Sequence, residues 1–118
     1  MMTRRGALQA APILPVHDLH RAIRTYEHLG FRLLHRYDTY ALLSREEVDI
    51  HLALTPNLEP EKNTSAVYLY VDDVAAEYHR ATGIRARHLT APRDEPWGVR
   101  EYQVIDEDGN LWRVGEVL

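Results

Sequence analysis

The pattern that most constrains the fold occurs twice along the chain. Segments Val16–Leu19 and Val71–Val74 both consist of a valine, a variable residue, an aspartate and a hydrophobic residue. The aspartate of each segment is a good helix N-cap, and a later glycine, Gly30 or Gly83, is placed to end the helix that follows. A repeat of this size suggests that neither copy can bury its own helix and sheet face, so the two copies associate.

The first half of the chain is predicted to be a βαβββ unit over residues 11–55. Apolar residues at helical spacing after Asp18 indicate one helix, and alternation along 48–55 indicates a strand. Pro12 and Pro15 each remove a backbone donor, so the first strand is expected at a sheet edge. The expected strands span residues 11–16, 31–37, 40–44 and 48–55.

A polar linker at 56–64 precedes a second βαβββ-like unit over 65–117, in which one strand is allowed to be reduced. The expected elements are strands at 65–71, 84–90, 99–105 and 111–117, a helix after Asp73 and a loop at 91–96. The turn at 106–110 is acidic and polar around one glycine, so Gly109 or Asn110 is expected to have a positive φ. Its charges favour a solvent-exposed turn.

Composition sets further limits on the class of protein. The 118 residues support a single domain, 1–118, and contain no cysteine, which excludes disulfides, thiolate metal sites and a cysteine nucleophile. A net charge of −4 without a basic stripe argues against nucleic acid as a partner. No apolar run is long enough to span a membrane, and the segment 1–9 is a poor signal peptide, so we expect a cytoplasmic protein.

The last hairpin also carries a resemblance to a known family. A Pro-Trp-Gly-x-Arg-Glu-aromatic strand at 96–102, followed by an Asp-x-Asp-Gly-Asn turn, resembles the bleomycin-resistance branch of the glyoxalase/bleomycin resistance/extradiol dioxygenase (vicinal oxygen chelate) superfamily. This resemblance implies an α+β fold in which two βαβββ modules form a curved mixed sheet around a cleft, with the helices on the convex side. It also implies a homodimer, in which a first strand or a module is commonly exchanged.

The resemblance bears directly on metal binding. In the metal enzymes of this superfamily the ligands come from the first and last strand of each module, and the corresponding positions here are Ala11, His51, Ala66 and Arg113. Alanine offers no donor and arginine is a cation, whereas a divalent site needs three or more suitable ligands. The resemblance therefore implies no metal and no cofactor, and metal-assisted lyase, dioxygenase or thiol-transfer chemistry is not expected.

Two other groups of polar residues have less specific patterns. His17 and His20 lie three positions apart at a helix start, but seven histidines in the chain can supply such a pair by chance, and we expect solvated side chains. Asp106 and Asp108 offer paired carboxylates for acid–base work. Their place in a turn favours a structural role instead.

Side-chain alternation along the strands predicts which residues line the cleft. If the implied metal positions face it, then Tyr68 faces it too, and small alanines leave room for a ligand. Aromatic walls bind flat or cationic molecules through stacking and cation–π attraction, and acidic residues such as Glu101 add negative charge. The alternative for each ring is packing in the core or a dimer interface, which is preferred for Tyr26, Tyr78, Tyr102 and Trp112. The candidate ligand-binding residues are Tyr37, Tyr40, His51, Tyr68, Trp97, Glu101 and Arg113.

The resemblance implies a metal-free, non-catalytic binding protein that sequesters an aromatic, cationic antibiotic in a dimer cleft. One alternative is an enzyme of the same superfamily, with an atypical metal site or with acid–base catalysis by His51 and Glu101. Another is a structural or regulatory dimer whose cleft is filled by its own side chains. The sequence does not name the ligand.

Overall fold

A computed structural model describes residues 8–118 of the chain. The prediction about a leader segment falls mainly on residues 1–7, which lie outside the described part. None of the helices in residues 8–118 is long and apolar enough to cross a membrane.

The first half forms a four-stranded sheet with one helix. Its strands are β1 (Ile13–Val16), β2 (Arg32–Arg36), β3 (Tyr40–Arg45) and β4 (Val48–Leu54), and its helix is α1 (Leu19–His28). The strand order is β1-β4-β3-β2, with β1 parallel to β4 and the other pairs antiparallel. β1 therefore lies at an edge, as its prolines predicted.

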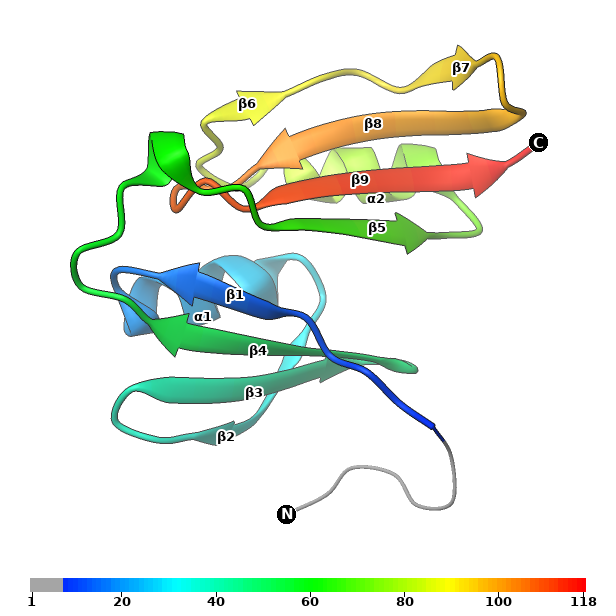
Figure 1. The fold of residues 1–118 in the computed structure, drawn as a ribbon. Coiled ribbons are helices and arrows are strands. Elements are labelled where there is room, and N and C mark those ends of the chain that lie inside the picture. The colour runs from blue at the N-terminus through cyan, green and yellow to red at the C-terminus, as the bar shows by residue number, and fades with distance from the viewer. Residues whose placement is uncertain (1–7) are drawn as a thin grey trace.

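The second half repeats this pairing pattern. After a short 3₁₀ turn, η1 (Pro60–Lys62), come β5 (Ala66–Tyr70), α2 (Val74–Ala81), β6 (His88–Leu89), β7 (Arg93–Glu95), β8 (Val99–Ile105) and β9 (Leu111–Val117). The sheet order is β5-β9-β8-β6, and β7 also pairs with β8. β5 runs parallel to β9 as β1 does to β4. Figure 1 shows both helices on the same side of the two sheets.

The helix caps form as the sequence predicts. The Asp18 side chain accepts a hydrogen bond from the Arg21 amide at 3.1 Å, and Asp73 accepts one from the Ala76 amide at the same distance. Gly30 has a φ of 98°, the left-handed conformation expected after α1. These local signals fix where each helix begins and where the chain reverses.

One hydrophobic core joins the two halves. Buried residues of α1 and of the first sheet belong to the same cluster as buried residues of α2 and of the second sheet. Tyr26 of α1 packs against Trp112 of β9 with ring centroids 5.9 Å apart, and Phe31 lies 6.1 Å from Trp112. Helix α1 thus covers part of the other half's sheet as well as its own, which holds the two sheets side by side.

Two predicted elements differ from the structure. The strand expected at 84–90 is reduced to the two residues of β6, and the loop expected at 91–96 contains the strand β7. The residues of β7 are all charged, so composition did not favour a strand. They pair with β8 in antiparallel register, and Arg100 of β8 donates to Asp94 of β7 at 2.6 Å, so the partner strand supplies the stability that the sequence lacks.

The prediction of a solvent-exposed turn at 106–110 is wrong. Asp106 and Asp108 are each only 3% exposed, and Asn110 is fully buried. Asp106 accepts from the Tyr26 hydroxyl at 2.6 Å, and Asn110 donates to the Pro15 carbonyl at 3.0 Å. Because these partners belong to the first half, the turn is a joint between the halves. Gly109 has the positive φ predicted for it, 88°.

The joint also holds one of the histidines expected to be solvated. Asp108 accepts from the His17 amide at 3.1 Å and lies 2.7 Å from the His17 ring nitrogen Nδ1, and Arg21 donates to the same oxygen at 3.4 Å. The His17 side chain is exposed to solvent, but its ring is held in place by the contact with Asp108. Its role is to satisfy a buried carboxylate rather than to bind a metal.

Candidate ligand-binding site

The sheet faces turned away from the helices, here called the open face, carry the predicted ligand-binding residues. Strand alternation places Leu14, Leu43, Ile50 and Val114 in the core, so their neighbours along the strands face the other way. Several large apolar and aromatic side chains are exposed on this open face. Its large exposed side chains include Ile13 (58%), Tyr37 (50%), Tyr68 (36%), Tyr70 (67%), Trp97 (60%) and Val117 (67%).

A polar cluster occupies the second sheet's open face. The Tyr68 hydroxyl of β5 donates to Glu101 of β8 at 2.7 Å, across the intervening strand β9. Glu101 is only 4% exposed, so a carboxylate lies buried beneath a partly exposed ring. Burial, followed by the hydrogen bond to Glu101, raises the pKa of Tyr68 to about 12, while the Trp97 indole acts in the opposite direction. Tyr68 therefore acts as a neutral donor over the ordinary pH range.

A glycine makes this reach across β9 possible. A Cβ at Gly115 would lie 2.5 Å from the Tyr68 hydroxyl oxygen and 2.6 Å from Cγ1 of Val99. Both distances are shorter than real contacts allow, so a side chain at this position would push Tyr68 away from Glu101. Sequence reasoning missed Gly115, although its parity with Arg113 could have placed it on the open face.

Tyr40 and His51 form a second pair, on the first sheet. The Tyr40 hydroxyl and the His51 ring nitrogen Nδ1 are 2.8 Å apart, and their rings meet edge to face. Burial raises the pKa of Tyr40 above its usual value. Tyr37 lies nearby in the chain and packs its ring on His35, with centroids 4.2 Å apart. This sheet thus presents an aromatic and hydrogen-bonding surface.

Arg113 is exposed on β9, where it stands in register with Tyr68 of β5 and Gln103 of β8. No hydrogen bond or ion pair holds its guanidinium within residues 8–118. The second sheet therefore carries a buried acid, Glu101, and an exposed base, Arg113, that has no acidic partner among the described residues. The seven predicted residues fall into two groups on different sheets, with Tyr68, Trp97, Glu101 and Arg113 on the second sheet and Tyr37, Tyr40 and His51 on the first.

The residues at the implied metal positions do not fit a divalent cation. Ala11 and Ala66 have no donor atom, Arg113 carries a positive charge, and Nδ1 of His51 faces the Tyr40 hydroxyl. Within residues 8–118 there is also no other group of three histidine or acidic side chains that could hold a metal. The four positions therefore offer no ligand set for metal-assisted chemistry.

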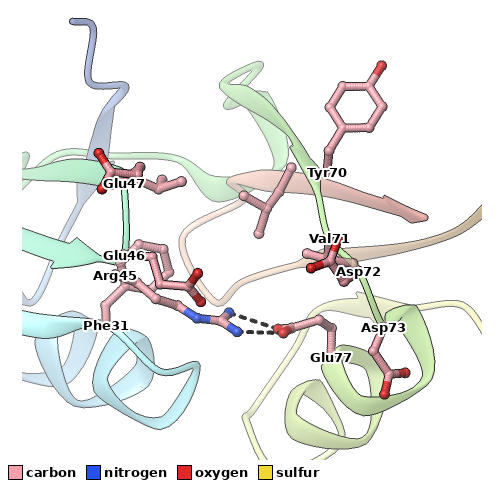
Figure 2. A pocket seen from close by; sticks show the side chains of 11 residues that line it. Phe31, Arg45, Glu46, Glu47, Tyr70, Val71, Asp72, Asp73 and Glu77 are labelled. Atoms are coloured by element: carbon pink, nitrogen blue, oxygen red, sulfur yellow. Dashed lines mark hydrogen bonds and ion pairs between the residues drawn. The ribbon is translucent and has the colours of Figure 1, made fainter. Parts of the chain in front are cut away.

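A cavity of about 330 Å³ lies elsewhere, between the end of β3 and the start of α2. Its walls include Phe31, Leu69 and Tyr70, and an ion pair between Arg45 and Glu77 crosses it, as Figure 2 shows. None of the seven predicted residues lines this cavity. It is therefore distinct from the open-face cluster.

Comparison with known proteins decides the family. The profile of the Glyoxalase/Bleomycin resistance protein/Dioxygenase superfamily matches residues 8–114. The chain belongs to this superfamily. A bleomycin resistance protein of Geobacillus stearothermophilus is 32% identical over 122 residues, covering 88% of this chain and 92% of the relative. A bleomycin resistance protein of Klebsiella pneumoniae is 27% identical over 113 residues, covering 90% of each.

Solved structures of the superfamily agree in fold. The crystal structure of a bleomycin-binding protein complexed with bleomycin superposes with a TM-score of 0.85 at 28% identity, covering 95% of this chain and 100% of that one. The bleomycin resistance determinant encoded on transposon Tn5 has the same TM-score, with 94% and 98% covered. The predicted family and fold class are thus confirmed, down to two helices on mixed sheets.

Proposed function

We propose that this protein binds an aromatic, cationic antibiotic of the bleomycin type on its open face and sequesters the drug without changing it. The observation that carries the proposal is the buried carboxylate of Glu101 beneath the Tyr68 ring, next to the exposed Trp97. Curated relatives at 27% and 32% identity are bleomycin resistance proteins. Resistance would follow from mass action, because bound drug is withdrawn from its target.

The roles of the residues follow from their charges. A cationic group of the drug is attracted to Glu101, and aromatic faces such as Tyr68 and Trp97 add stacking and cation–π attraction of about 0.5–2 kcal/mol each. Arg113 repels a cation, so it favours the neutral or anionic part of the ligand. Tyr40 and His51 offer hydrogen bonds on the other sheet.

The proposal includes a homodimer. Apolar side chains such as Ile13 and Val117, which are 58% and 67% exposed, form a surface that a monomer would leave in water. Covering this surface with a second copy would bring the open face of one protomer against that of its partner. Two clefts per dimer, a cytoplasmic location and the absence of a metal belong to the same proposal.

A calorimetric titration with bleomycin tests the proposal. Wild-type protein should bind the drug, and Glu101→Gln and Trp97→Ala should each weaken binding by at least ten-fold, since they remove the anionic and aromatic contacts. Glu27→Gln, an exposed acid on the helix side, is the matched control and should bind like the wild type. Equal binding by all the variants would contradict the site, and no binding of bleomycin or of other aromatic drugs would contradict the function.

Mass spectrometry of the drug after prolonged incubation separates sequestration from catalysis. The proposal expects the drug to be recovered with its mass unchanged. A modified product that requires His51 and Glu101 would instead support an enzyme of the same superfamily.

A further inference from the structure

A second hollow lies beside Gly30, where the start of β2, the end of β3 and the last turn of α2 meet. It measures about 490 Å³ and is lined by Gly30, Arg32, Ser44, Arg45, Glu46 and Arg80. Arg32 and Arg45 come from the first half, and Arg80 comes from the last turn of α2. We propose that this hollow binds a small oxyanion, either free inorganic phosphate or sulfate or the same group on a larger organic molecule.

Two guanidinium groups from opposite halves converge on Gly30. The position that a Cβ on Gly30 would occupy lies 3.1 Å from Nε of Arg45 and 3.1 Å from Nη1 of Arg80. Gly30 has no side chain, and its φ of 98° disfavours any other residue, so the space beside these nitrogens stays open. Arginine presents its N–H groups in a planar fork that matches the oxygens of phosphate and sulfate.

Among the three arginines that line the hollow, Arg45 is held in place by hydrogen bonds. Its two terminal nitrogens donate to the carboxylate of Glu77 on α2, and Nη1 also donates to the Leu29 carbonyl at 3.3 Å. The Nε–H group takes part in none of these hydrogen bonds and lies beside Gly30, so it is available to a ligand in the hollow. The ion pair, visible in Figure 2, therefore positions one donor and ties the two halves together.

The charge balance leaves a positive excess. Glu77 and Glu46 both act on Arg45 and compensate its charge. Arg32 and Arg80 have no acidic partner within residues 8–118. The C-terminal end of α1 carries a partial negative charge, which disfavours a bound anion. The Leu29 carbonyl at this end, however, already accepts a hydrogen bond from Arg45. An oxyanion placed between Arg32, Arg80 and Nε of Arg45 would relieve the repulsion among these groups.

Thermal unfolding with inorganic phosphate tests the proposal, with sodium chloride at matched ionic strength as the reference. A ligand that binds only the native state raises the melting temperature, so phosphate should give a saturable rise that chloride does not. The double variant Arg32→Ala/Arg80→Ala should lose this rise, with binding weakened at least ten-fold. Arg24→Ala removes an exposed arginine of α1 outside the hollow and should behave like the wild type.

Amide NMR of the wild-type protein locates the site even if the double variant folds poorly. The Gly30 amide should shift saturably with phosphate. An unmoved Gly30 signal, or a rise in melting temperature that survives in the double variant, would overturn the proposal. Phenyl phosphate distinguishes the two sources of the anion: tighter binding than inorganic phosphate indicates a group on an organic molecule, and equal or weaker binding indicates the free ion.

Discussion

Tyr68 shows how a single side chain links the fold to the proposed ligand site. Its ring is exposed on the open face, while its hydroxyl reaches across β9 to a carboxylate that water barely touches. Side-chain alternation predicted that Tyr68 faces this surface. The pairing with Glu101 could not be predicted, because it depends on a glycine, Gly115, on β9, the strand that lies between Tyr68 and Glu101 in the sheet.

The Tyr68 hydroxyl should lose its proton at a higher pH than an ordinary tyrosine. Its pKa in the folded protein is about 12, against an ordinary value of 10.0, so the unfolded chain loses this proton first. The stability contributed by the neutral phenol is therefore complete below pH 10 and is lost as the pH rises through 12. In an absorbance titration, the Tyr68→Phe variant should show one tyrosine fewer ionising at high pH than the wild type. The tyrosines that ionise at lower pH should be unchanged. A late component of unchanged size would contradict the assignment.

Gly115→Ala should displace the Tyr68 ring and weaken drug binding. The new methyl group would overlap the Tyr68 hydroxyl and Val99, so one or both must shift. Overpacking of this kind costs about 1–3 kcal/mol, which urea denaturation can measure. Adding Tyr68→Phe should recover part of this loss, since it removes one of the two overlaps. No recovery would show that the Val99 contact alone sets the cost.

At the scale of elements, local signals predicted the helices and the last hairpin well. The N-caps Asp18 and Asp73, the left-handed Gly30 and the strands β8 and β9 all depend on residues close together in the chain. The turn between β8 and β9 was misjudged because its partners are distant: His17 is 91 residues from Asp108. A run of acidic residues predicts a solvent-exposed turn unless hydrogen-bond donors from distant parts of the chain are known to contact it.

Asp106→Ala should be strongly destabilising. Its Oδ1 accepts from the amides of Asp108 and Asn110, and its Oδ2 accepts from the Tyr26 hydroxyl. Removing the carboxylate leaves buried donors without acceptors, and we expect a loss of about 3 kcal/mol in the free energy of unfolding. Glu107→Ala, in the same turn, should cost less than about 1 kcal/mol, because its contact with Arg21 is partly exposed. Similar losses in both variants would show that the turn is not the joint described.

At the scale of the whole molecule, the proposed homodimer makes a prediction about the open face. Sedimentation should show a dimer, and Ile13→Asp should shift it toward monomer by placing a charge on the edge strand β1. The exposed aromatic and apolar side chains would then be covered only in the assembled form. A wild-type monomer at micromolar concentration would contradict this expectation, whereas drug binding by that monomer would show that one open face suffices.

The core that both halves share has a consequence for cutting the chain. A break beside the exposed Asn57 leaves each piece with half of a hydrophobic surface and half of the joint around Asp106. We expect neither fragment, 1–57 or 58–118, to fold alone, and their mixture to reassemble into a nicked protein whose recovered circular dichroism reports complementation. A superfamily member of this kind would then serve as a split reporter, switched on when two tethered partners bring its fragments together.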